Sequence, residues 1–167
     1  NYFSIMESVL VVTISGPDRA GLVEQLAARV TEHGGNWEHS RMTHLADRFV
    51  GLLQITVPSK QRQNLESAIY AIPDLEVTIS QAKISAQAPK EIVFELELIG
   101  SDHLGIVRDI FSSLAKAGAN VESLCTQTSN AAESGGLIFK ANARLSCSSS
   151  MDLDSLRTNL EAIAQDI

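Results

Sequence analysis

The chain has 167 residues, a length that suits one medium domain or two small ones. Hydrophobic residues make up 44% of it and charged residues 20%, a composition that can bury a core and is not that of a disordered chain. The net charge of −7 argues against direct binding to nucleic acid, because that binding depends on Lys and Arg side chains that neutralise phosphates.

The first half of the sequence predicts six elements in the order strand, helix, strand, strand, helix, strand. A β-branched run at 9–14 predicts a buried strand. From Gly21 the apolar residues change to helical spacing, and the helix should end near His33, before two glycines. The remaining predicted elements are strands at 36–46 and 49–57, a helix at 60–71 and a strand at 75–79.

The second half predicts the same order with the last strand missing. Its predicted elements are a strand at 92–99, a helix at 105–117, strands at 120–128 and 137–145 on either side of a polar loop, and a helix at 153–163. Either the last strand is absent or the chain continues past Ile167. We therefore expect a first domain at 6–81, a linker at 82–90 and a second domain at 91–167.

A repeated motif supports this division into two units. The sequence GPDRAGLV at 16–23 returns as GSDHLGIV at 100–107, an offset of 84 residues. At the same offset Gly34, Asn36 and Glu38 match Gly118, Asn120 and Glu122. The predicted fold class is α+β, with two ferredoxin-like β-α-β-β-α-β units in tandem and antiparallel sheets that carry their helices on one face.

Asp18 and Asp102 occupy the turn between the first strand and the first helix of each unit. Each carboxylate could cap the helix by accepting its free N–H groups. Alternatively, the turn could bind an α-amino acid, with the helix N–H groups at the ligand carboxylate and the Asp at its ammonium group. The glycines at 21 and 105 have two explanations as well, namely close packing of the helix on the sheet or room for a ligand.

Asn36 and Asn120 open the second strand of each unit and are further candidates for ligand contact. An Asn amide could contact both charged ends of an amino acid, or it could simply cap exposed backbone. A site that combines Asp18 with Asn120, or Asp102 with Asn36, would form across an interface between units.

The histidines and cysteines show no catalytic or metal-binding pattern. His103 replaces Arg19 in the repeat, and either side chain could contact a ligand carboxylate or lie solvated in its loop. Cys125 and Cys147 form no C-x-x-C pair, which favours reduced thiols and a cytoplasmic protein. No membrane-spanning run is visible, and we expect no enzyme activity, metal or cofactor.

In this chain Gly-x-Asp-Arg-x-Gly-Leu-Val is followed by Gly-Gly-Asn, and its second copy, Gly-x-Asp-His-x-Gly-Ile-Val, is followed by Gly-Ala-Asn. On the predicted β-α-β-β-α-β plan, both copies resemble the ACT domain. A short chain of two such units is similar to the glycine cleavage system transcriptional repressor family. The resemblance implies ligand contacts at the first turn and at the start of the second strand. Those positions are Gly16, Asp18, Arg19, Ala20, Asn36, Gly100, Asp102, His103, Leu104 and Asn120.

The resemblance also implies a regulator that binds a small amino acid, glycine or serine, and acts through protein–protein contacts. Its protein partner would be a DNA-binding activator, and exposed sheet edges favour a homodimer. Two alternatives stay open at this point. One is a regulatory subunit of a metabolic enzyme, and the other is an adaptor module that binds no ligand.

Overall fold

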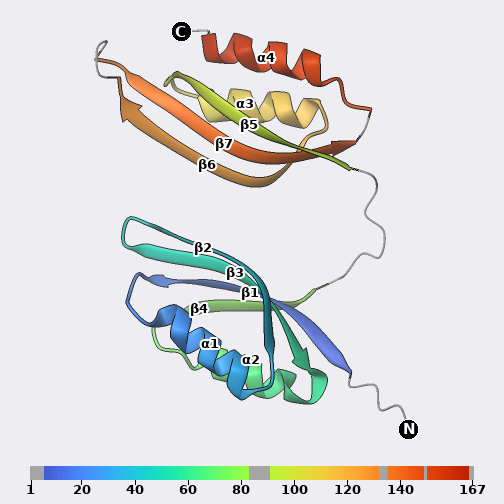
Figure 1. Cartoon of the computed structure of the whole chain (residues 1–167). Coiled ribbons are helices and arrows are strands. Elements are labelled where there is room, and N and C mark those ends of the chain that lie inside the picture. The colour runs from blue at the N-terminus through green and yellow to red at the C-terminus, as the bar shows by residue number, and fades with distance from the viewer. Residues whose placement is uncertain (1–5, 83–90, 132–134, 149, 166–167) are drawn as a thin grey trace. The chain divides into compact units, whose positions relative to one another are not determined.

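Two compact units, Asn1–Ile84 and Ser85–Ile167, make up the chain. The computed structural model describes residues 6–82, 91–131, 135–148 and 150–165 (Figure 1). In each unit the helices cover one face of an antiparallel sheet (Figure 1). The predicted fold class is therefore confirmed.

The first unit follows the predicted element order from β1 to β4. Its elements are β1 (Glu7–Pro17), α1 (Leu22–Glu32), β2 (Asn36–Leu45), β3 (Arg48–Pro58), the short 3-10 helix η1 (Ser59–Gln61), α2 (Arg62–Tyr70) and β4 (Glu76–Gln81). The strands lie in the order β2-β3-β1-β4, so β1 is paired on both sides.

Every second residue of β1 is buried, and these residues form part of the core of the first unit. Leu10, Val12 and Ile14 point to the helix layer and are buried. They meet the apolar stripe of α1, which consists of Leu22, Leu26 and Val30, and the buried side chains of α2. The strand period of two and the helical period of 3.6 thus bring one apolar face of each element together.

The second unit contains β5 (Glu91–Ser101), α3 (Ile106–Lys116), β6 (Asn120–Asn130), β7 (Leu137–Ser148) and α4 (Leu153–Gln165). Its strands lie in the order β5-β7-β6. The core again joins one face of the sheet to the stripe of α3, made by Ile106, Ile110 and Leu114. No strand follows α4 within the residues that the structure describes.

Candidate functional site

The turn between the first strand and the first helix is held in the same way in both units. In the second unit the Asp102 N–H donates to the Leu137 carbonyl oxygen at 2.8 Å. In the first unit the Asp18 N–H donates to the Asp47 carbonyl oxygen at 3.0 Å. The repeated motif therefore fixes each turn against the neighbouring strand of its sheet.

The proposed capping role of Asp18 and Asp102 is wrong. The residues that precede α1 and α3 are Gly21 and Gly105, and no side chain donates or accepts a capping hydrogen bond at either helix start. The first N–H groups of a helix have no acceptor within the helix itself. The Ile106 N–H at the start of α3 donates to the His103 carbonyl oxygen at 3.2 Å, and the N–H groups that follow it could donate to a bound anion, as could those at the start of α1.

Backbone conformation explains the repeated glycines better than either steric explanation does. Gly21 and Gly105 both adopt φ of 84°, a left-handed conformation that other residues rarely take. A Cβ atom added at either position would meet nothing within 4 Å. Close packing of the helix on the sheet is thus not the reason for glycine at these positions.

A hollow of about 620 Å³ lies at the turn of the second unit. It contains three of the predicted site residues, Asp102, His103 and Leu104. The sequence did not identify the other side of the hollow, which is formed by Thr126, Gln127, Thr128 and Phe139. These residues come from β6 and β7, and only the strand register brings them beside the turn.

One pair of facing strand residues beside this hollow differs between the units. Thr126 faces Ala141 across β6 and β7, just as Met42 faces Gly51 across β2 and β3. Met42 packs against the core of the first unit. It also lies close to Gly51, because a Cβ atom added to Gly51 would be only 2.7 Å from the Met42 Cγ atom. Thr126 has a shorter side chain than its counterpart Met42 and is exposed at the hollow.

His103 supplies an unsatisfied polar atom at this hollow. Its Nδ1 lies 3.2 Å from the Leu104 carbonyl oxygen, which can only accept, so Nδ1 carries the proton of this bond. Its Nε2 is buried and has no hydrogen-bond partner in the described structure. A buried polar atom without a partner carries a desolvation cost of about 1–3 kcal/mol, which a bound ligand would remove.

In the first unit, the corresponding Arg19 is already occupied. Its guanidinium group donates to Gln25 Oε1 at 2.9 Å and to the Pro73 carbonyl oxygen at 3.3 Å. Gly16 is tightly packed as well, because an added Cβ would lie 2.8 Å from the Asp74 carbonyl oxygen. Asp18 and Ala20 are exposed beside them.

Asn36 and Asn120 lie at the other end of their sheets. Asn36 and Val9 both pair with Thr56, so Asn36 lies at the same height in the sheet as Val9, near the start of β1. Asp18 comes directly after the last residue of β1, at the opposite end of the strand. Nine residues along the strand, from position 9 to position 18, correspond to roughly 30 Å at about 3.3 Å per residue. Within one unit, the asparagine and the aspartate therefore do not form a common site.

Each asparagine has a local partner beside an irregularity in its strand. Asn36 Nδ2 donates to Glu38 Oε1 at 2.8 Å, and Asn120 Nδ2 donates to Glu122 Oε1 at 3.3 Å. The register shifts at these same places in β2 and β6. The repeated Asn-x-Glu pattern thus accompanies a repeated β-bulge.

No group of three or more His, Cys, Asp or Glu side chains in the described ranges could hold a metal ion. None of the described helices combines the length and the apolar character needed to cross a bilayer.

Comparison with known proteins finds a family match for the first unit. Residues 8–82 match the ACT domain family. A crystal structure of an unknown protein from Galdieria sulphuraria is 28% identical, with a TM-score of 0.84 over 95% of this chain and 92% of that chain. No curated protein matched the sequence.

A second solved structure is described as a candidate glycine cleavage system transcriptional repressor. It is 22% identical and covers 95% of this chain and 91% of that chain, with a TM-score of 0.65. Both structures extend over the two units, so the shared fold includes the second unit, which lies beyond the family match. The first unit therefore matches the ACT domain family, and the chain as a whole shares the fold of both solved structures.

Proposed function

We propose that this chain is a regulatory protein that binds a small amino acid and acts through protein–protein contacts. The observation that carries the proposal is the hollow of the second unit, where the buried Nε2 of His103 has no partner. His103 lines this hollow together with Asp102 and the first residues of α3, Ile106 and Val107. The hollow therefore combines a carboxylate, a basic ring nitrogen and free N–H groups.

An α-amino acid suits this combination of groups. Its carboxylate would accept from the free N–H groups at the start of α3, where the helix dipole favours negative charge. Its ammonium group would donate to the Asp102 carboxylate. His103 lines the same hollow and would lie beside the bound ligand.

The proposed ligand is glycine or serine, and the proposed role is control of amino-acid metabolism, as in a glycine cleavage system repressor. The likeness in fold to the structure described as such a repressor supports this choice. The partner would be a DNA-binding activator, since the acidic chain itself is poorly suited to bind DNA. We place the protein in the cytoplasm as a homodimer, with its two cysteines reduced.

A thermal-shift screen of the purified chain against the twenty amino acids tests this proposal. A ligand that binds only the folded state raises its apparent stability, so selective stabilisation by glycine or serine supports the proposal. Isothermal titration with the same amino acid then gives the affinity and the number of sites. No response to any amino acid would overturn the proposal and favour an adaptor without a ligand.

Recovery of protein partners from the native host separates the proposed role from its main alternative. A DNA-binding protein among the partners supports the role in transcription. A metabolic enzyme instead would show that the chain is a regulatory subunit, with the same ligand but a different output.

A further inference from the structure

The hollow at the turn of the second unit is lined from two sides. One side is the turn itself with the first residues of α3, from Asp102 to Val107. The other side comes from the paired strands β6 and β7, and consists of residues 126–128 and Phe139. A ligand whose charged groups meet the turn would therefore present its side chain to the strands.

Two threonines face the hollow from β6. Thr126 pairs with Ala141 and Thr128 pairs with Phe139. Directly opposite residues of an antiparallel pair lie on the same face of the sheet. Ala141 and Phe139 are buried in the core, so both threonines lie on the face that carries the helices, whereas Gln127 lies on the other face. Both threonines are exposed, and they stand roughly 7 Å apart along the strand.

The first unit has no hydroxyl group at these two positions. At the offset of 84, the counterparts of Thr126 and Thr128 are Met42 and His44. Met42 packs against the core of its own unit. The strand side of the turn therefore offers a ligand different groups in the two units, and only the second unit offers a pair of hydroxyls there.

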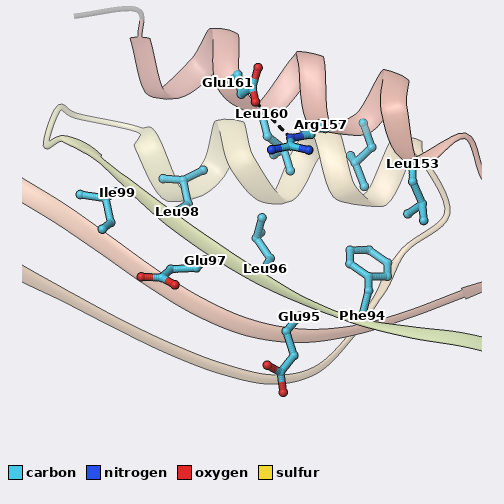
Figure 2. A pocket seen from close by; sticks show the side chains of 11 residues that line it. Phe94, Glu95, Leu96, Glu97, Leu98, Ile99, Leu153, Arg157, Leu160 and Glu161 are labelled. Carbon is cyan, nitrogen blue, oxygen red and sulfur yellow. Dashed lines mark hydrogen bonds and ion pairs between the residues drawn. The ribbon is translucent and has the colours of Figure 1, made fainter.

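A second hollow of the same unit offers a polar ligand less. It has a volume of about 480 Å³ and lies between β5 and α4 (Figure 2). Phe94 and Leu96 point toward the helices there, and Arg157 Nε already lies 3.2 Å from Glu161 Oε1 (Figure 2). Among the described residues, the one buried side-chain polar atom without a partner is Nε2 of His103, which lines the hollow at the turn. That hollow is therefore the better site for a polar ligand.

We propose that Thr126 and Thr128 select the side chain of the bound amino acid and favour one that carries a hydroxyl group. The inference rests on the proposed function, because it takes an α-amino acid as the ligand of this hollow. A threonine hydroxyl can donate and accept, so it pairs with the hydroxyl of serine in either direction. Glycine has no side chain to reach the threonines. The methyl group of alanine would displace water from them without replacing its hydrogen bonds.

Isothermal titration of the full chain with serine, alanine and glycine tests this inference. Alanine is the matched control ligand, because it differs from serine only by the hydroxyl oxygen. We expect serine to bind about tenfold more tightly than alanine, the effect of one or two hydrogen bonds between neutral groups. Glycine or alanine that binds as tightly as serine would overturn the inference.

Thr126→Val and Thr128→Val, alone and together, remove the hydroxyls and keep branched side chains of similar size. The double variant should bind serine no more tightly than alanine, with its affinity for alanine unchanged. Thr126→Ser with Thr128→Ser keeps the hydroxyls and should keep the preference for serine. Thr43→Val, at an exposed strand position of the first unit, is the matched control and should change neither affinity.

The outcomes separate this inference from the proposed function. A preference for serine that survives in the double valine variant would show that another group reads the hydroxyl, and the inference would be wrong. Circular dichroism checks the fold of each variant, and the single variants supply the same comparison if the double variant does not fold. If no amino acid binds the wild-type chain, the proposed function fails and this inference fails with it. Equal affinities for serine and alanine overturn the inference alone and leave the amino-acid site in place.

Discussion

At the scale of single residues, the two units differ most clearly in the bonding of the equivalent residues Arg19 and His103. Both follow the aspartate of the repeated motif, yet Arg19 is bonded within its own unit and His103 keeps a buried nitrogen without a partner. The same sequence motif thus gives a satisfied turn in the first unit and an unsatisfied one in the second. This difference predicts which turn binds the ligand.

We expect His103→Ala to weaken binding of glycine or serine by roughly 10- to 100-fold. A hydrogen bond to a charged group contributes about 1.5–3 kcal/mol, which corresponds to this range of affinity. Isothermal titration measures the effect. The matched control is Arg19→Ala, which removes contacts to Gln25 and Pro73 but should leave the affinity unchanged. An equal loss in both variants would refute the assignment to the second unit.

Gly21→Ala should lower the free energy of unfolding by about 1–2 kcal/mol, the cost of a left-handed conformation for a residue with a Cβ. Because a Cβ there meets nothing within 4 Å, the loss would come from backbone strain alone. Gly21→Asn is the control, since asparagine tolerates this conformation better. Urea denaturation of both variants measures the difference. Equal destabilisation by Ala and Asn would point to a steric cause instead.

Sequence patterns located only part of the candidate site. The repeated motif identified Asp102 and His103 because glycine, aspartate and a basic residue recur at fixed spacing. It gave no signal for Thr126 or Phe139, since these are ordinary strand residues and reach the hollow only through the register of β6 and β7. The capping role of the aspartates failed because a left-handed glycine lies between each aspartate and its helix.

At the scale of elements, the one helix with a described aspartate cap is α4. Asp152 Oδ1 accepts from the N–H groups of Asp154 and Ser155, and Oδ2 accepts from Ser155 Oγ at 2.8 Å. The Ser155 hydroxyl contributes most to lowering the pKa of Asp152 below its ordinary value of 3.8, followed by the Ser155 N–H. The ionised carboxylate is therefore the form that stabilises α4.

A lowered folded-state pKa fixes the direction of the pH dependence of this cap. The stabilising effect is fully present above the ordinary value of 3.8 and is lost as the pH falls through the lower folded-state value. We expect Asp152→Ala to lower the melting temperature at pH 7, and we expect this difference from the wild type to shrink below about pH 4. Thermal melts from pH 7 to pH 3 measure it.

Asp152→Asn is the control for this prediction. Its side-chain oxygen can still accept from the helix N–H groups, but it does not ionise in this range. The variant should keep most of the stability at pH 7 and lose the pH dependence that the carboxylate contributes. A difference between Asp152→Ala and the wild type that stays constant down to pH 3 would exclude the charged cap.

The elements themselves were the most predictable part of the fold. The alternation in β1 and the apolar stripes of α1 and α3 specify both the type of element and its buried face. The ends of strands were less predictable because pairing sets them. β7 continues to Ser148, three residues past its predicted end, since Ser146 and Cys147 find partners in β5.

At the scale of the whole molecule, the chain contains two separate cores built on one plan. The buried residues of the first core all lie in the first unit, and those of the second core all lie in the second. In the second core, Phe94 and Leu96 of β5 are half-buried, whereas their counterparts Leu10 and Val12 in the first core are 0% exposed. We therefore expect the second unit to unfold at the lower denaturant concentration.

Matched core variants test whether the two cores unfold separately. Leu26 and Ile110 are counterparts in the repeat, and both are 0% exposed. Truncation of such a side chain to alanine costs about 2–5 kcal/mol.

Trp37 is the one tryptophan of the chain and packs against the first core, so its fluorescence reports unfolding of the first unit. Leu26→Ala should shift the fluorescence transition to lower urea, whereas Ile110→Ala should shift only the transition seen by circular dichroism. If Ile110→Ala moves the fluorescence transition as far as Leu26→Ala does, the two units unfold as one cooperative body, and the order of unfolding expected from the half-buried Phe94 and Leu96 is wrong.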